Sequence, residues 1–333
     1  MKRKSAKLKT QKEFKLLNKE LIKVKKERDI IIKCSQYLSA PKKARFEFTK
    51  QNVSCFRVKD MCRVLCVSKS GYYKWLVRTP SKRDQHNQIL LKEITKIHFK
   101  NKKRYGSPRI ARELKAIGIN ASEKLIRKLM KSASLETVFK RKFRITTNSS
   151  HKYPIVENKL QRSFQAHREN EVWVSDITYI WAGKRWLYLT VIIDFYDRKL
   201  LGWSLSTTLK TRYTTVEALK KATTNRPIRE NSSLIFHSDR GTQYACREFV
   251  EELNKCKSII RSMSRKGNCW DNAVSESFFK TIKTELIHQN NYQNKREAEQ
   301  SIAEYIEIYY NAVRRHVYLD NLNMKEYHKH TYK

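Results

Sequence analysis

Acidic residues are scarce in this chain. Of its 333 residues, 32 are Asp or Glu and 72 are Lys or Arg, which gives a formal net charge of +40. A chain of this charge repels itself at low salt, and its natural complement is a polyanion such as nucleic acid. Hydrophobic residues still make up 40% and aromatic residues 11% of the chain, so it is a globular protein and not a basic disordered tail.

Several sequence signatures are also missing. No run of about 18 apolar residues is present, and the basic N-terminus has no apolar stretch behind it, so we expect neither a membrane span nor a signal peptide. The seven cysteines include no CxxC pair and no zinc-finger spacing, which indicates buried thiols in a reducing cytoplasm. There is no GxSxG elbow and no Walker-type phosphate loop, so no ATP dependence is expected.

The positive charge is concentrated in the first half. Residues 1–150 hold 42 Lys or Arg and 11 Asp or Glu, whereas residues 151–333 hold 30 and 21. The first part is therefore the expected footprint on nucleic acid, and the second has the balance of an enzyme domain. We expect five segments: a helical, coiled-coil-like segment (1–45), a helix-turn-helix DNA-binding region (46–150), a linker (151–166), a catalytic core (167–290) and a C-terminal helix and tail (291–333).

Residues 10–40 follow the pattern of one helix. Apolar side chains recur at alternating spacings of three and four, Arg28 and Ser35 interrupt the series, and Pro41 ends it. This seam suits either a partner helix or packing on the chain itself, and the sequence does not decide between the two.

Two helix-turn-helix shapes follow. In the first, over residues 55–80, Ser68 is a plausible N-cap for a second helix Lys69–Leu76, although a plain helical hairpin is the alternative. In the second, Pro108 starts one helix and Ser122 caps the next. The basic side chains expected to contact DNA phosphates here are Arg109, Lys124, Arg127 and Lys128.

From residue 171 the periodicity changes to that of strands. Strands are predicted at 172–180, 186–194, 200–205, 234–237 and 259–263, and helices at 212–224, 246–255, 272–288 and 295–311. The fold class expected is α/β: a ribonuclease-H-like mixed sheet with the order βββαβαβα, preceded by an all-helical DNA-binding region.

Three acidic residues occupy unusual places in this pattern. Asp176 lies in the middle of the first strand, Asp239 ends a second apolar strand, and Glu276 lies on the long helix. A carboxylate in an apolar strand is costly to desolvate unless a cation pairs with it. Two hard cations such as Mg²⁺, held by carboxylate oxygens, clamp a phosphate ester for in-line displacement.

Basic residues lie close to the third acid in the sequence. Lys280 and Lys283 share a helix face with Glu276 and lie along an expected DNA path, although Glu276 paired with Lys280 on a solvated helix is the plain alternative. Arg265 and Lys266 belong to a loop expected near the catalytic face.

Other polar residues nearby are expected to be structural. Asp271 is interpreted as the N-cap of the long helix, and Asp194 and Asp197 as turn residues. Glu285 should face away from Glu276. A structural hydrogen bond is the favoured role of His237, with proton transfer as the alternative.

Four motifs occur in order: WVSDITY from 173, HSDRGTQY from 237, SMSRKGNCWDNA from 262 and ESFFKTIKTE from 276. Together with RYGSPRI from 104, CRVLCVSKSGYYKW from 62 and YNAVRRH from 310, they closely resemble the integrase-core transposases of bacterial insertion sequences, the OrfB product of the IS-three family. The resemblance covers residues 25–327.

The resemblance implies a catalytic D,D,E triad of Asp176, Asp239 and Glu276 that holds two Mg²⁺ or Mn²⁺ ions. It implies DNA cleavage and strand transfer at the element's ends, with Lys283 similar to the family's DNA-contacting basic residue. The expected partners are terminal inverted repeats, target DNA, further copies of the chain and the upstream-frame protein. The expected location is cytoplasmic and nucleoid-associated.

One departure keeps alternatives open. The family usually has 35 residues between the second Asp and the Glu, whereas this chain has 36, and the extra residue is expected within 255–258. A catalytically inactive DNA-binding regulator derived from a transposase is therefore one alternative. A structure-selective ribonuclease-H-like nuclease is another.

Overall fold

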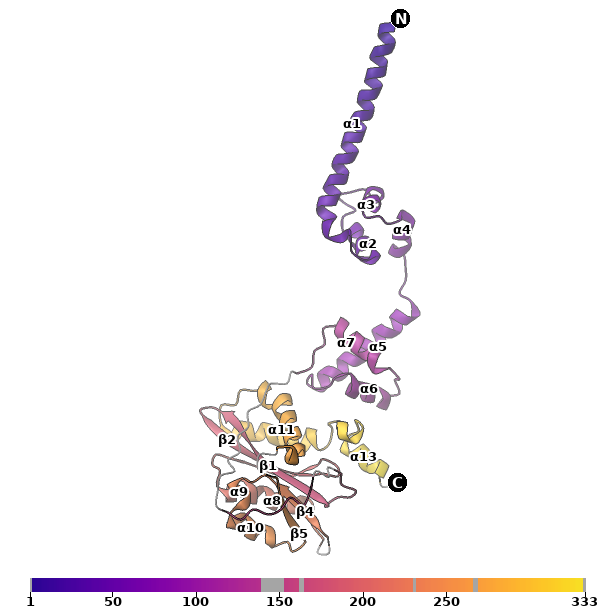
Figure 1. The fold of residues 1–333 in the computed structure, drawn as a ribbon. Coiled ribbons are helices and arrows are strands. Elements are labelled where there is room, and N and C mark those ends of the chain that lie inside the picture. Colours follow the sequence, from indigo (N-terminus) through magenta and orange to yellow (C-terminus); the bar gives the residue numbers. More distant parts are fainter. Residues whose placement is uncertain (1, 139–152, 162–164, 230–231, 266–268, 332–333) are drawn as a thin grey trace. The chain divides into compact units, whose positions relative to one another are not determined.

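The computed structural model describes residues 2–138, 153–161, 165–229, 232–265 and 269–331. They form two compact units, Met1–His86 and Asn87–Lys333, whose elements are labelled in Figure 1. Each unit contains one of the two predicted helix-turn-helix shapes. No helix in the described part of the chain is long and apolar enough to cross a membrane.

The first unit is a set of helices around a small core. Its helices are α1 (Lys2–Cys34), α2 (Lys42–Gln51), α3 (Val58–Val64) and α4 (Lys69–Leu76). Ser68 caps α4, because its Oγ accepts a hydrogen bond from Gly71 N at 3.0 Å. The second helix predicted for residues 55–80 and its N-cap are therefore confirmed. The core residues are Ile30, Cys34, Phe48, Met61 and Leu65.

Helix α1 buries only its C-terminal end. Ile30 and Cys34 are fully buried, whereas Phe14, Leu17 and Leu21 are each at least half exposed. The helix ends at Cys34 and a 3₁₀ turn, Ser35–Tyr37, follows. The first part of the apolar seam predicted for this helix, at Phe14, Leu17 and Leu21, is therefore not covered by the described residues of this chain.

The second unit begins within α5 (Lys82–Lys100), whose residues up to His86 belong to the first unit. Two further helices follow, α6 (Ser107–Ala116) and α7 (Glu123–Ser132). Pro108 is the second residue of α6, one position later than predicted. Ser122 caps α7, as predicted, by accepting a hydrogen bond from Leu125 N at 3.3 Å. The apolar sides of the three helices meet in one core that includes Leu90, Ile94, Ile110, Leu114 and Ile126.

A five-stranded mixed sheet forms the centre of the second unit. Its strands are β1 (Val172–Ala182), β2 (Arg185–Asp194), β3 (Leu200–Ser206), β4 (Leu234–Ser238) and β5 (Ile259–Met263). The order is β3-β2-β1-β4-β5. The first three strands are antiparallel, while β4 and β5 run parallel to β1. The predicted mixed sheet is therefore confirmed.

Helices cover both faces of the sheet. One face carries α8 (Thr215–Asn225), α9 (Thr242–Ala245) and α10 (Arg247–Asn254). The other carries α11 (Ala273–Glu285), α12 (Lys295–Ala303), the π-helix Glu304–Tyr310 and α13 (Met324–Thr331). Figure 1 shows α8 and α10 on the side of the sheet opposite to α11.

Glu285, the last residue of α11, ties three regions of the second unit together. Its carboxylate is buried and pairs with Arg314 of the C-terminal segment at 2.7 Å and with Arg109 of α6 at 3.4 Å. Tyr305 donates a hydrogen bond to it at 2.8 Å. Helices α5–α7 and the C-terminal segment are thus fixed to the end of α11.

Candidate active site

Asp176 and Asp239 come from neighbouring strands. In the parallel pair of β1 and β4, Ser175 is paired with Ser238. Asp176 is the next residue of β1, and Asp239 is the residue after the end of β4. The two aspartates therefore lie side by side where β4 ends. The Asp239 carboxylate is oriented locally, because its Oδ1 accepts a hydrogen bond from Gly241 N at 2.9 Å.

Helix α11 covers the face of the sheet to which Asp176 belongs. Alternate residues of a strand share a face, and Val172 and Val174 pack in one cluster with Phe278 and Ile282 of α11. Asp176 continues the series of the two valines. It therefore lies on the α11 side of the sheet.

Glu276 lies in the first turn of α11. Asn272, just before the helix, donates from Nδ2 to Ser175 O at 3.4 Å, which ties the start of α11 to β1 one residue before Asp176. The charge of Glu276 also acts on the Asp176 carboxyl. The structure thus brings Asp176, Asp239 and Glu276, here called the acidic trio, to one side of the sheet.

The electrostatics of the acidic trio are unfavourable without a cation. Burial raises the pKa of Asp176 well above its ordinary value, and the negative charges of Asp239 and Glu276 raise it further. The hydrogen bond from Ile177 N and the charge of Lys283 act in the opposite direction. Burial also raises the pKa of Glu276. A bound cation would reverse these effects.

The donor set fits a hard divalent ion, because it consists of carboxylate oxygens alone. Among the described residues, the group whose three ligand atoms lie within 4.8 Å of one another is Glu169, Asp197 and His328. The acidic trio is spread more widely than that.

Two supporting residues of the site were missed by sequence reasoning. Tyr244 is fully buried, and its hydroxyl lies 2.8 Å from Ser175 Oγ, next to Asp176 in sequence. Burial raises the pKa of Tyr244 well above its ordinary value, and the charges of Asp176 and Asp239 add to this. The signal was present, since Tyr244 ends the motif that contains Asp239.

The two lysines of α11 differ in their surroundings. Lys283 is half-buried; burial lowers the pKa of its ammonium group, and the charge of Asp176 counteracts this. Lys280 is exposed, and its charge lowers the pKa of Glu276. Lys283 therefore lies within electrostatic reach of the acidic trio, whereas Lys280 faces solvent beside it.

The interpretation of Asp271 as an N-cap is wrong. Asn272 precedes α11, and Asp271 is a fully buried acceptor instead. Its carboxylate binds the Arg265 guanidinium at 2.9 Å and accepts a hydrogen bond from Asn158 Nδ2 at 2.9 Å. A helix start shifted by one residue freed Asp271 to hold Arg265. Lys266, next in the predicted basic loop, lies outside the described residues.

The basic residues predicted in α6 and α7 fall into two groups. Lys124, Arg127 and Lys128 are exposed on α7. Arg109 has a side chain only 17% exposed, paired with Glu285 and lying over the Tyr105 ring. The α7 residues thus present their charges to solvent, while Arg109 joins α6 to α11.

His237 has a structural environment. Both ring nitrogens are engaged, Nδ1 with Ser262 Oγ at 2.9 Å and Nε2 with Ser264 Oγ at 3.1 Å. The ring is fully buried, and burial lowers the pKa of His237 to about 4. It links β4 to β5 as a neutral imidazole, in agreement with the favoured interpretation.

The longer spacing between the second and third acids leaves the sheet regular. β5 pairs with β4 over all five of its residues, from Leu234 with Ile259 to Ser238 with Met263. The segment 255–258 lies between α10 and β5. The register next to Asp239 is therefore intact.

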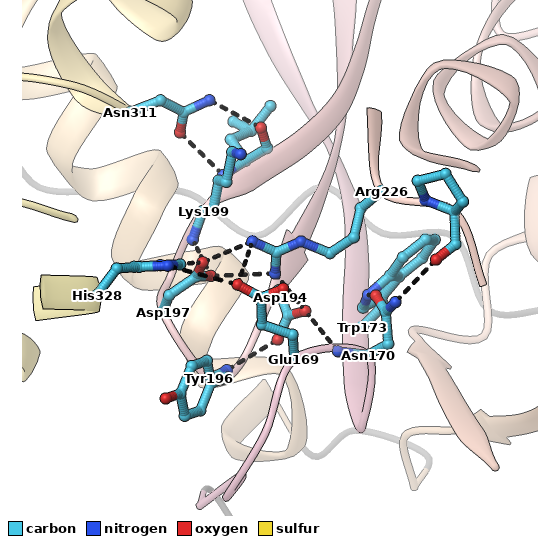
Figure 2. A network of polar contacts seen from close by, with 12 residues as sticks. Glu169, Asn170, Trp173, Asp194, Tyr196, Asp197, Lys199, Arg226, Asn311 and His328 are labelled. Atoms are coloured by element: carbon cyan, nitrogen blue, oxygen red, sulfur yellow. Dashed lines mark hydrogen bonds and ion pairs between the residues drawn. The ribbon is translucent and has the colours of Figure 1, made fainter. Parts of the chain in front are cut away.

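A second group of buried acids lies at the end of β2, shown in Figure 2. Asp194 and Asp197 are fully buried, and Arg226 pairs with them at 2.7 and 2.6 Å. His328 of α13 lies 3.0 Å from Asp197, and Glu169 lies 3.4 Å from Arg226. The three carboxylates that pair with Arg226, those of Glu169, Asp194 and Asp197, are here called the arginine-bound acids. Both aspartates also accept hydrogen bonds from backbone groups two residues on, as predicted for turn residues.

Models of two known domain families match parts of the chain. Residues 166–269 and 257–323 match models of the integrase core domain, and residues 85–143 match a model of an HTH-like domain. A transposase InsF for insertion sequence IS3A from Escherichia coli (strain K12) is 34% identical over 285 residues, which cover 85% of this chain and 98% of the relative. The chain belongs to the IS3 family of insertion-sequence transposases.

Another relative in this family shows a higher identity. The insertion element IS600 uncharacterized 31 kDa protein of Shigella sonnei is 40% identical over 265 residues, covering 79% of this chain and 95% of the relative. The fold and family implied by the sequence motifs are therefore confirmed.

Solved integrase structures are more distant. A simian T-cell lymphotropic virus intasome matches 71% of this chain and 74% of that chain with 16% identity and a TM-score of 0.40. The HTLV-2 integrase catalytic core domain in complex with magnesium matches 49% of this chain and 99% of that chain with 16% identity and a TM-score of 0.36.

Proposed function

We propose that the chain is a DNA transposase that cleaves the ends of an insertion sequence and joins them to target DNA. The observation that carries this proposal is the position of the acidic trio. Asp176 and Asp239 follow a paired position of two parallel strands, and Glu276 lies on the helix that covers the same face. The named activity of the IS3 relatives supports the same reaction.

The acidic trio would hold a pair of Mg²⁺ or Mn²⁺ ions. Bound there, such ions would activate a water or the 3′-hydroxyl of a DNA strand as nucleophile and would stabilise the leaving oxygen at phosphorus. The raised pKa of Asp176 supports this assignment, because mutual repulsion among the carboxylates needs a cation to offset it. Two reactions at one site, hydrolysis and strand transfer, need no further acid or base from His237, whose nitrogens are both engaged.

The basic residues have separate roles in this proposal. Lys283 would hold a phosphate of the terminal DNA next to the acidic trio, and Lys280 would continue that path on the solvent side. Lys124, Arg127 and Lys128 would bind the DNA backbone through α7. The HTH-like match over residues 85–143 supports DNA binding by this part of the chain. Pairing two element ends would require more than one copy.

A strand-transfer assay tests the proposal. Labelled DNA carrying one end of the element is incubated with the full chain, Mg²⁺ and a plasmid target, and joined product is measured. Asp239→Asn should abolish joining, whereas Asp320→Asn should not, because Asp320 is exposed and its side chain makes no contact described in the structure. Asn also suits the left-handed backbone of position 320.

Three outcomes would contradict the proposal in different ways. Joining that survives Asp239→Asn would reject the assigned ligands. DNA binding without cleavage by the unaltered chain would favour an inactive regulator. Cleavage without joining would favour a structure-selective nuclease.

A further inference from the structure

A polar cavity lies beside α11, on a different side of the helix from Glu276. Its volume is about 450 Å³, and its wall includes Ser277 and Thr281 of α11, Arg198 from the turn after β2, and Tyr318 from the C-terminal segment. Ser277 is one residue, about 100° of helix rotation, from Glu276. The cavity is therefore next to the proposed active site without being part of it.

The lining of this cavity is positively charged. It includes three arginines and neither Asp nor Glu. Arg109 and Arg314 both pair with Glu285, which lies behind the wall. Burial lowers the pKa of His316, another lining residue, to about 3, so it adds no charge at neutral pH. Arg198 therefore remains as the cation that Glu285 does not neutralise.

Arg198 has no carboxylate partner in the described part of the chain. Its guanidinium lies 3.7 Å from the centre of the Tyr318 ring and 5.1 Å from that of Phe195. Asp194 is close enough to favour its charge, but the Asp194 carboxylate is bound to Arg226. The two rings hold the guanidinium in place, and the Tyr318 hydroxyl also interacts with it as a hydrogen-bond partner.

One donor of Arg198 is left over. Nη1 is buried and has no hydrogen-bond partner among the described residues. The residue also has a left-handed backbone, with φ of +61°, which is unfavourable for a side chain of this size. A buried cationic donor without an acceptor is destabilising. An anion bound in the cavity beside the guanidinium would offset this charge.

The first turn of α11 favours the same ligand. Ala273 and Val274 line the cavity, and Asn272, just before the helix, makes no side-chain capping hydrogen bond. A helix N-terminus attracts negative charge. Ser277 and Thr281 add hydroxyl groups to the wall.

A second cavity lies further along α11. It has a volume of about 250 Å³, shares Arg109, Ser277, Thr281 and Arg314 with the first, and is also lined by Lys280 and by Glu285, which pairs with the two shared arginines. Lys280, four residues after Glu276, thus lines a cavity that adjoins the one at Arg198.

We propose that the cavity at Arg198 binds a backbone phosphate of a DNA strand that passes around α11 from the active site. The source of the phosphate rests on the proposed function, whereas the affinity for a phosphate group rests on the cavity itself. Arg198 is here a binding residue, with its guanidinium held in place by Tyr318.

Binding measurements on the full chain test this proposal. Arg198→Met keeps the aliphatic volume and removes the charge, and Lys220→Met is the matched control, because Lys220 is an exposed cation on α8, on the opposite face of the sheet. Affinity for a fluorescein-labelled single-stranded oligonucleotide is measured by anisotropy over a range of salt concentrations in EDTA. We expect Arg198→Met to weaken binding about tenfold and to lower the salt slope by about 0.7, with little change for Lys220→Met.

Thermal unfolding separates a binding role from a structural one. Arg198→Met should unfold at the same or a higher temperature than the unaltered chain in phosphate-free buffer, because it removes an unsatisfied buried charge. A lower unfolding temperature together with unchanged DNA affinity would overturn the proposal and assign Arg198 to packing of Tyr318. Equal weakening by both variants would overturn it as well.

Inorganic phosphate and deoxyadenosine monophosphate distinguish the sources of the anion. If either raises the unfolding temperature through Arg198 while oligonucleotide affinity does not depend on Arg198, the cavity takes small anions and the DNA assignment is wrong. Because binding is measured without a divalent metal, this result is independent of the acidic trio. If strand transfer is absent but oligonucleotide affinity still depends on Arg198, the result contradicts the proposed function and leaves the phosphate site standing.

Discussion

The sheet of the second unit carries two groups of buried acids that differ in how their charge is balanced. The arginine-bound acids have a cation within the chain, since Arg226 pairs with Asp194 and Asp197 at 2.7 and 2.6 Å. The acidic trio has Lys283 within electrostatic reach, yet the pKa of Asp176 remains well above its ordinary value. By contrast, hydrogen bonds from His328 and Arg226 lower the pKa of Asp197 to about 2 against the effect of burial.

This comparison teaches how a structural acid group differs from one prepared for a metal. Two of the arginine-bound acids, Glu169 and Asp197, place ligand atoms within 4.8 Å of each other and of His328, but Arg226 already pairs with both carboxylates. The acidic trio is not such a compact group among the described residues. Compactness alone would therefore have selected a different group from the proposed active site.

The largest expected effect concerns the acidic trio. Asp176→Asn should reduce strand transfer about 1000-fold or more, because several kcal/mol of metal-dependent stabilisation are lost. Its unfolding temperature should not fall, since the substitution removes repulsion with Asp239 and Glu276. Joined product and thermal unfolding are measured on the same preparations. A variant that loses activity only because it unfolds would not support the comparison.

Substitution of Arg226, the cation of the arginine-bound acids, should instead lower the stability of the fold. Arg226→Met leaves Asp194, Asp197 and Glu169 without their shared partner and should lower the free energy of unfolding by about 3–5 kcal/mol. Urea denaturation measures this. Arg247→Met is the control, because Arg247 pairs with Glu251 on the exposed surface of α10, where a salt bridge contributes little to stability. Equal effects of the two substitutions would contradict the structural role of Arg226.

Lowering the pH should reduce the stability that the arginine-bound acids contribute, because Asp197 becomes protonated. Because its folded-state pKa is lowered from 3.8 to about 2, its contribution to stability is present above about pH 4 and is lost as the pH falls toward 2. The contribution is about 2 kcal/mol. Urea midpoints of the unaltered chain and Asp197→Asn should converge between pH 5 and pH 2.5. A constant difference over this interval would show that Asp197 is not the titrating group.

The smallest expected effect is direct stabilisation by metal. Mg²⁺ at about ten times its dissociation constant should stabilise the unaltered chain by about 1 kcal/mol, and Asp176→Asn should show less. Thermal unfolding with Mg²⁺ or with matched ionic strength of NaCl measures the difference. Stabilisation that persists in Asp176→Asn would place the ion elsewhere, and Asp197→Asn then tests the arginine-bound acids.

Much of the fold followed from local sequence patterns. The alternation of side chains located the five strands, with β5 placed at its observed bounds, and Ser68 and Ser122 marked helix starts correctly. Where a local rule had two candidates, it failed: Asp271 was assigned as the N-cap of α11, but it is buried and bound to Arg265. Adjacent Asp and Asn have similar capping propensity, so only the tertiary contacts separate them.

The sequence by itself determined the elements, the family and the three acids of the proposed site, because periodicity, caps and motifs are encoded within short segments. The tertiary structure alone decided which buried acids receive a cation from within the chain. Arg226 is 32 residues from Asp194, and His328 is 131 residues from Asp197. It likewise left Arg198 beside two aromatic rings with an unsatisfied donor. Charge balance in a protein interior depends on groups that are close in space, and spacing along the chain does not encode that proximity.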